Sequence, residues 1–223
     1  MNFSDFKNAN GFEIDEHFES KLLSDLSIEE LAYIHLNRKK HNTEIKCASV
    51  SSSLFDLIET AQASFINYRT RIYTPLLACF AVLDQIGGAY GSQRRSVNAS
   101  NGIKLALNLF GSYTDDEIKY LVTLRNGLYH DGSLISKSRD GRTNVVFRLD
   151  PDSSATLTMP QKPWDGTYHD SLGDNIARIN VRLFKDDVEK IALNCQNELL
   201  DGTLIFKIQN TREFFYKFLF AVS

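Results

Sequence analysis

Two side chains that could act together on a phosphate, Arg125 and His130, stand five residues apart in this chain. An arginine guanidinium stays protonated at neutral pH, and its planar fork can grip two phosphate oxygens. Histidine, with an unperturbed pKa of ~6.5, exchanges protons near neutrality. Cleavage of RNA by its own 2′-hydroxyl needs proton carriers and a positive charge on the phosphorane. The pair therefore predicts a site for phosphate chemistry.

The surrounding residues predict one helix that carries both groups. Thr114 and Glu117 form a capping box, so we expect the helix to start at Asp115. At about 100° per residue, Arg125 falls in the middle of an apolar stripe. The stripe comprises Ile118, Leu121, Val122 and Tyr129, with Leu128 at its edge. A guanidinium buried without a partner costs several kcal/mol, so we expect polar surroundings, an open cleft or an anionic ligand at Arg125.

The spacing sets a geometric problem for the pair. On an ideal helix Arg125 and His130 diverge by about 140°, whereas Asn126 and His130 lie on one face. Gly127 weakens the helix, and Asp131-Gly132 predicts its end. Two arrangements would let the groups converge: His130 could leave helical geometry at the helix end, or two copies of the chain could meet across a twofold axis.

An Arg followed by four residues and a His, with Asn directly after the Arg, resembles the HEPN superfamily, whose hallmark is R-x4-6-H. The resemblance covers residues 51–133. It implies a homodimer whose motif lines an interface cleft and, in many members, a metal-independent endoribonuclease of defence or toxin type. Other members are noncatalytic dimerisation modules or bind nucleotides or partners. Gly132 stands where one toxin subgroup carries Tyr, which argues against that subgroup.

The residue types predict distinct roles at such a site. We expect Arg125 to stabilise the phosphorane, His130 to transfer protons, and Asn126 to orient the hydroxyl or the imidazole. Tyr129 either stacks on a base or packs. One histidine does not easily serve as both base and acid, so a twofold-related pair would be the natural arrangement.

A structural interpretation explains the same residues without catalysis. A histidine at a helix C-terminus is favoured by the helix dipole, and Asn126 can bond to the backbone. Arg125 could form an ion pair with a carboxylate on a packed neighbour. The candidates are Asp84, Asp56 and Glu59.

The charge distribution favours one region for binding RNA. The net charge of −3 argues against a strong nonspecific nucleic-acid binder. Residues 1–30 carry −6 and residues 149–223 carry −3, whereas residues 31–148, which hold the motif, carry +6. We expect basic clusters there to guide RNA to the motif, although surface cations are common. The clusters are Arg94 and Arg95, Lys137, Arg139 and Arg142, and Arg69 and Arg71.

Composition favours a cytoplasmic protein without a metal or cofactor. The odd set of Cys47, Cys79 and Cys195 contains no CxxC pair, which predicts reduced thiols and no zinc site. The N-terminus lacks the pattern of a signal peptide. The longest apolar run, residues 75–83, is far shorter than the ~20 residues that span a bilayer. RNA and a second copy are the expected partners, and an operon-encoded regulator is a further one that the chain does not identify.

Periodicity predicts a mainly α, α+β fold in one domain, residues 1–223. A HEPN-like helical bundle at residues 51–133 is followed by a β-rich addition at residues 136–184. Helices are expected at residues 14–23, 27–40, 53–72, 74–87, 101–110, 115–131, 188–199 and 212–221. Strands are expected at residues 144–149 and 155–159, joined as a hairpin, and at residues 179–183 and 203–208. Residues 136–142 should form a charged loop, and residues 160–174 a loop anchored by Trp164 that borders the cleft together with the hairpin.

Overall fold

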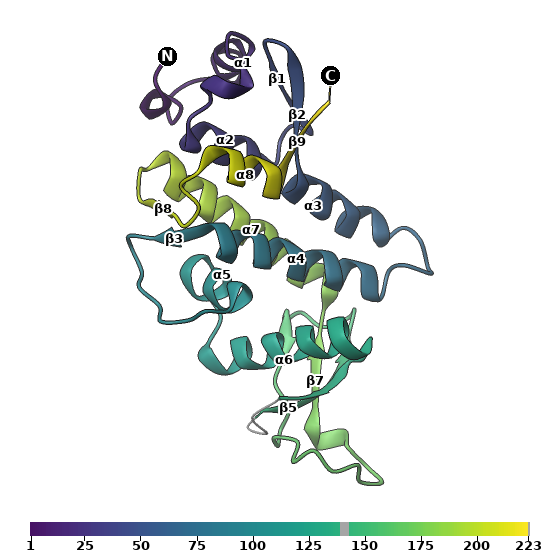
Figure 1. The fold of residues 1–223 in the computed structure, drawn as a ribbon. Coiled ribbons are helices and arrows are strands. Elements are labelled where there is room, and N and C mark those ends of the chain that lie inside the picture. Colours follow the sequence, from purple (N-terminus) through teal and green to yellow (C-terminus); the bar gives the residue numbers. More distant parts are fainter. Residues whose placement is uncertain (139–142, 223) are drawn as a thin grey trace.

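The structure, a computed structural model, describes residues 1–138 and 143–222 and is mainly helical with small β-sheets (Figure 1). This confirms the α+β, mainly α class. The helices are α1 (Gly11–Glu19), α2 (Ile28–Leu36), α3 (Ser53–Ser64), α4 (Tyr73–Ala89), α5 (Gly102–Phe110), α6 (Asp115–Asp131), α7 (Val181–Leu200) and α8 (Thr211–Phe218). Short 3-10 helices cover Phe3–Asp5, Leu23–Asp25 and Gly173–Asn175.

The strands form three separate sheets within the described ranges. The strands are β1 (Asn42–Ile45), β2 (Ala48–Ser52), β3 (Tyr90–Ser92), β4 (Ile135–Lys137), β5 (Asn144–Leu149), β6 (Leu157–Thr158), β7 (Ile176–Ile179), β8 (Leu204–Phe206) and β9 (Leu219–Val222). Their orders are β1-β2-β9, β3-β8 and β4-β5-β7-β6. Because β9 pairs with β2, the C-terminal strand completes a sheet whose other two strands lie within residues 42–52.

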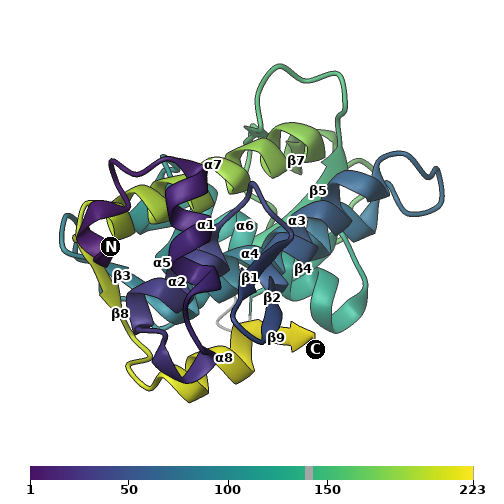
Figure 2. The same ribbon diagram turned by 90° about the horizontal axis from the view of Figure 1, so that it is seen from above.

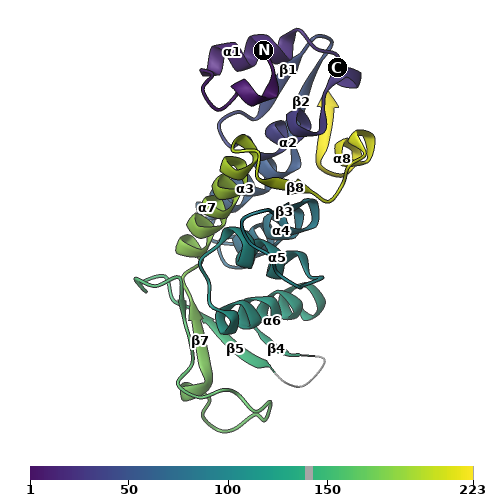
Figure 3. The ribbon, with the colours of Figure 1, turned by 90° about the vertical axis from the view of Figure 1, so that its left-hand side faces the viewer.

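The elements stack as successive layers along an elongated molecule (Figure 3). The end with both termini holds α1, α2, α8 and the sheet β1-β2-β9. Next come α3, α4 and α7, with α3 and α4 packed side by side (Figure 2). The helices α5 and α6 follow, and the four-stranded sheet covers the far side of α6. No helix within residues 1–138 or 143–222 combines the length and apolar character needed to cross a bilayer.

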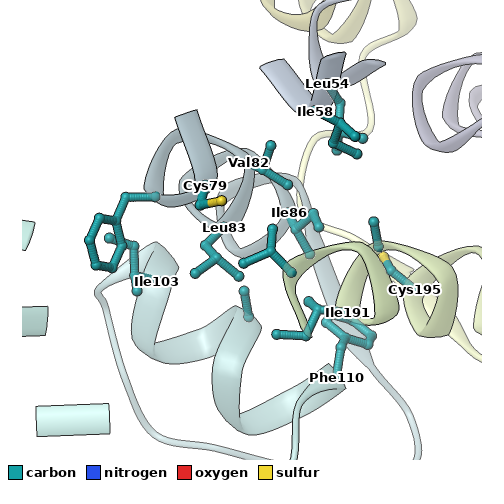
Figure 4. Packing of buried hydrophobic residues seen from close by; sticks show 14 of the residues in the cluster. Leu54, Ile58, Cys79, Val82, Leu83, Ile86, Ile103, Phe110, Ile191 and Cys195 are labelled. Atoms are coloured by element: carbon teal, nitrogen blue, oxygen red, sulfur yellow. The ribbon is translucent and has the colours of Figure 1, made fainter. Parts of the chain in front are cut away.

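Helix α4 is the centre of the hydrophobic core, as its near-continuous apolar sequence predicts. Its buried side chains meet residues of three other helices (Figure 4). Those from α4 are Cys79, Val82, Leu83 and Ile86, and they meet Leu54 and Ile58 of α3, Ile103 and Phe110 of α5, and Ile191 and Cys195 of α7. Residues far apart in the chain therefore depend on α4 for their relative placement.

Two glycines, Gly87 of α4 and Gly102 of α5, let the two helices approach each other closely. A Cβ built on Gly87 would lie 1.8 Å from the carbonyl oxygen of Gly102, whereas one on Gly88 would meet nothing within 4 Å. The predicted end of the helix at these glycines is wrong, because α4 continues to Ala89. Gly87 serves the helix crossing rather than a turn.

Several predicted helix bounds shift for local reasons. The predicted helix at residues 53–72 ends at Ser64, and Tyr68 and Ile72, at the end of its predicted range, are exposed. The predicted helix at residues 27–40 ends at Leu36 and gives way to β1 and β2, which were not predicted. The first helix covers residues 11–19 rather than 14–23, because Asn10 and Glu13 cap it. The C-terminal helix ends at Phe218 and becomes β9.

The predicted hairpin after the motif is wrong. Strand β7 lies between β5 and β6, parallel to β5 and antiparallel to β6. The predicted charged loop contributes β4, which pairs antiparallel with β5, while its residues 139–142 lie outside the described residues. Val145, Val146 and Phe147 of β5 are all fully buried, so both faces of this strand are covered, as is usual for a strand with a parallel neighbour. The predicted strand at residues 179–183 is wrong, because β7 covers Ile176–Ile179 and residues 181–183 begin α7, which Asn180 caps.

A buried polar cluster links α2, α4 and β3. The ring of fully buried His35 lies with Nδ1 2.7 Å from the Tyr90 hydroxyl and Nε2 3.1 Å from Oε1 of Gln85. The hydroxyl of Ser53 donates to the same Gln85 oxygen at 3.1 Å. Desolvation lowers the pKa of His35 to about 4, so the ring is neutral at pH 7.

The glycine crossing predicts opposite effects for two adjacent substitutions. Gly88→Ala should raise the free energy of unfolding by about 0.5–1 kcal/mol, because an exposed helical alanine fits without contact. Gly87→Ala should lower it by at least ~2 kcal/mol through backbone overlap with Gly102. Urea unfolding of both variants measures this, and equal effects would contradict the crossing.

Burial of neutral His35 predicts a loss of stability in acid. The unfolded chain binds a proton with a pKa of ~6.5 and the folded chain with a pKa of about 4. The unfolded state therefore gains protons first as the pH falls, and up to about 3 kcal/mol is lost between pH 6.5 and 4. His35→Gln should flatten this part of the stability profile relative to wild type. A variant profile as steep as that of wild type would argue against the buried neutral ring.

Candidate functional site

Helix α6 remains regular from its predicted start to beyond His130. Thr114 and Glu117 form the predicted capping box. The helix ends at Asp131, and Gly132 follows in the left-handed conformation with a φ of 61°. Both predicted bounds are confirmed. Because His130 lies inside the helix, it keeps helical geometry and cannot turn toward Arg125 within one chain.

The predicted position of Arg125 in the middle of the core stripe is wrong. Helix α6 packs against α4 and α5 on one side and against β4 and β5 on the other. Because the sheet also covers the helix, Tyr120, Thr123 and Gly127 are buried as well, and the centre of the buried surface of α6 lies away from Arg125. The Arg125 side chain therefore lies at the edge of this buried surface and is 24% exposed.

Three groups hold the Arg125 guanidinium. Its Nη2 donates to Oδ2 of Asp84 at 3.0 Å. Its Nη1 lies 3.4 Å from Oδ1 of Asn126, a long contact, and its centre lies 4.6 Å from the ring centroid of Tyr129. Among the described residues no group accepts from its buried Nε. Of the three carboxylates considered from the sequence, Asp84 is the partner.

Asp84 and Tyr129 are themselves fixed by neighbouring elements. A Cβ built on Gly102 at the start of α5 would lie 3.1 Å from Oδ1 of Asp84, so the carboxylate sits directly against that backbone. The Tyr129 hydroxyl donates to the carbonyl of Leu77 in α4 at 2.9 Å. Burial and the Asp84 carboxylate raise the pKa of Tyr129 above its usual value. Arg125 is thus positioned by α4 and α6 together.

The remaining face of α6 is open. His130 is exposed, Asn126 is half-buried, and Tyr129 is 43% exposed despite its bond to α4. Val122 continues this face toward the N-terminus as a half-buried residue. These side chains carry an imidazole, an amide and an aromatic ring on one surface, with the Arg125 guanidinium at its edge.

The predicted arginine pair lies far from this face. The Nη1 of Arg95 donates to the carbonyls of Asn108 and Gly111, immediately before α6 begins. Arg94 pairs with Asp201 at 2.6 Å. Helix α6 has 17 residues and is about 25 Å long. Since His130 lies at its other end, one chain does not bring Arg94 and Arg95 to the motif.

The loop with Trp164 also lies elsewhere than predicted. Trp164 is 3% exposed and donates from Nε1 to the carbonyl of Thr167 at 2.7 Å, so it anchors the loop as expected. It lines a cavity together with Asp116 and Lys119, near the N-terminal end of α6, whereas His130 lies at the C-terminal end. The prediction that this loop shields the motif is wrong.

Lys137 lies against two aromatic rings of the same loop. Its Nζ lies 5.5 Å from the ring centroid of Trp164 and 5.6 Å from that of Tyr168. The predicted RNA-binding residue Arg139 lies outside the described residues. Within the described part of the chain, no group of three His, Cys, Asp or Glu side chains could hold a metal ion.

Comparison of the chain with models of protein families, with curated proteins and with solved structures found no match.

The bond between Arg125 and Asp84 predicts a measurable coupling. In a double-mutant cycle of Arg125→Gln and Asp84→Asn, we expect about 1 kcal/mol between two side chains that are 24% and 35% exposed, decreasing with added salt. The exposed pair Lys119 and Asp116 on the same helix is the control and should show no measurable coupling. Equal coupling in the two pairs, measured by urea unfolding, would mean that Asp84 does not hold Arg125.

Proposed function

We propose that this chain is a HEPN-like, RNA-binding protein of the cytoplasm, which cleaves RNA without a metal at a cleft between two copies. One observation carries the proposal. The intact helix α6 presents Asn126, Tyr129 and His130 on an open face, with Arg125 held beside them by Asp84.

Two copies supply what one chain lacks. The regular helix keeps Arg125 and His130 about 140° apart, so one chain cannot aim both at the same phosphate. If the open faces of two α6 helices meet across a twofold axis, the cleft between them receives two arginines and two histidines, one of each from each chain. The open face is partly apolar through Val122 and Tyr129, which suits such an interface.

The chemistry that follows uses each group once. One neutral His130 accepts the proton of the ribose 2′-hydroxyl as its oxygen bonds to phosphorus. The protonated His130 of the second copy donates to the 5′-oxygen as its bond to phosphorus breaks, which leaves a 2′,3′-cyclic phosphate. Arg125 stabilises the charge of the phosphorane with the guanidinium N–H groups that Asp84 does not use. Asn126 orients the attacking hydroxyl or the imidazole, and Tyr129 stacks on a base.

A noncatalytic module is the second candidate, and one observation favours it. The Arg125 guanidinium already has a carboxylate and an aromatic ring as partners within the chain. In that case the open face of α6 binds a second copy, a regulator encoded nearby or RNA without cutting it. The two candidates differ in whether His130 changes any chemical rate.

The catalytic proposal predicts cleavage of single-stranded RNA in EDTA with cyclic phosphate ends. His130→Ala should lose at least ~10²-fold in rate, because no other group on this face transfers protons near neutrality. Arg125→Ala should lose a comparable factor, worth ~3 kcal/mol. The control is His41→Ala, which removes another exposed histidine, at the start of the sheet β1-β2-β9, and should leave the rate unchanged.

Folding is checked for every variant by thermal unfolding, so that lost activity is not lost structure. Cleavage that survives in His130→Ala would refute the catalytic role. Wild-type protein that binds RNA but cleaves none would establish the noncatalytic module instead.

A further inference from the structure

A cavity of about 310 Å³ lies where the connection between α3 and α4 meets the start of α7. The ends of β5 and β7 complete its wall. None of the described residues that line it belongs to α6, so the cavity is separate from the face proposed to act on RNA. Its size suits a small ligand. Most of the side chains in its lining are apolar, namely Phe65, Ile72, Leu149, Pro151, Ile179 and Val181.

Two of these apolar residues belong to a predicted helix that the structure cuts short. The apolar pattern that predicted a helix over residues 53–72 includes Phe65 and Ile72, but α3 ends at Ser64. Both side chains line the cavity instead, and Ile72 is 41% exposed. A ligand that covers such apolar area gains free energy, because it removes the area from water. The wall therefore favours a ligand with an apolar body.

Two guanidiniums border the same cavity. Arg71 and Arg182 both line it, whereas no described Asp or Glu does. Within residues 1–138 and 143–222, neither guanidinium forms an ion pair with a carboxylate. The centre of the Arg182 guanidinium lies 4.6 Å from the ring centroid of Phe65, so this cation is held over a residue of the wall. Two cations beside an apolar wall favour a ligand that also carries an anionic group.

The remaining polar residue of the lining is committed to the fold. Asn180 is 5% exposed, and its Nδ2 donates to the carbonyls of Pro151 at 3.1 Å and Ser153 at 2.8 Å. Its Oδ1 accepts from the backbone N–H groups of Arg182 at 3.1 Å and Leu183 at 3.3 Å, as the N-cap of α7. Among the described lining residues, only the two arginines therefore have side-chain polar groups left for a ligand.

We infer that this cavity binds a small amphipathic anion, which has an apolar chain or ring and one anionic head. The apolar body covers Phe65 and Ile72, and the head lies between Arg71 and Arg182. A nucleotide suits the cavity less well, because the wall has no acceptor side chain left to read a base or a sugar. An inorganic anion would leave the apolar wall in water. The head is a carboxylate or a phosphate, since a guanidinium binds both.

Calorimetry on the whole chain with octanoate, octyl phosphate, octanol and acetate tests the inference. The first two probes join an apolar chain to a carboxylate or a phosphate, whereas octanol lacks the charge and acetate lacks the chain. We expect at least one of the two amphipathic anions to bind at one site per chain. Its affinity should be at least ~10-fold higher than that of octanol or acetate, because only it uses both the arginines and the apolar wall.

The arginine variants connect this binding to the cavity. Arg71→Gln and Arg182→Gln should each lose at least ~10-fold in affinity for the anion that wild type binds. Both side chains are exposed, so the free variants should unfold at the temperature of wild type and should be stabilised less by the added anion. The control is Arg69→Gln, which changes an exposed arginine outside the lining whose Nε donates to the Tyr68 hydroxyl, and it should bind as wild type does.

Three results would overturn the inference. These are no binding of either amphipathic anion by wild type at millimolar concentration, equally tight binding of octanol or acetate, and wild-type affinity in both Arg71→Gln and Arg182→Gln. Unchanged binding by His130→Ala would support the independence of this cavity from the proposed RNA site.

Discussion

The packing of α6 between a helical layer and a sheet is the constraint on which the rest of this structure depends. On one side the helix meets α4 and α5, and on the other it meets β4 and β5. Gly127 permits the second contact, since a Cβ there would lie 2.8 Å from Cβ of Ser136. A glycine that weakens an isolated helix here lets β4 approach the C-terminal part of α6.

This regularity decides what the motif can do. Because the helix does not end before His130, the directions of Arg125 and His130 are fixed relative to each other. Asp84 adds a second restraint, as it holds the guanidinium from α4. The chain therefore has a pre-positioned arginine and an exposed histidine that do not converge within one copy. A rigid scaffold of this kind reduces the entropy lost on binding, for a catalyst and for a binding module alike.

Local signals in the sequence predicted local structure well. The capping box of α6 at Thr114 and its end before Gly132 depend on residues within one turn, and both are confirmed. The helix predicted at residues 101–110 is also present, as α5. Asp84 stood among the possible partners of Arg125. The hairpin failed because pairing of β5 with β7 joins residues about thirty positions apart, which no turn signal reveals.

The position of Arg125 was predicted wrongly and the cavity lined by Arg71 and Arg182 was not predicted, because both depend on contacts between elements far apart in the chain. A stripe of apolar residues indicates one buried face, but α6 is buried on two, and residues such as Thr123 and Gly127 carry no apolar signal. The cavity brings Arg71 together with Arg182 through the packing of α7 on α3 and α4. Only the folded chain shows that both arginines border one apolar wall.

The central claim is that the open faces of two α6 helices meet, and a distance between two copies tests it most directly. Exposed Cys47 would be changed to serine and a spin label attached at Lys119→Cys, on the face of Asn126 and His130. Facing helices of about 25 Å, packed about 10 Å apart, should give a distance between labels below ~40 Å in pulsed electron paramagnetic resonance. The absence of any distance between copies, or only longer ones, would contradict the account.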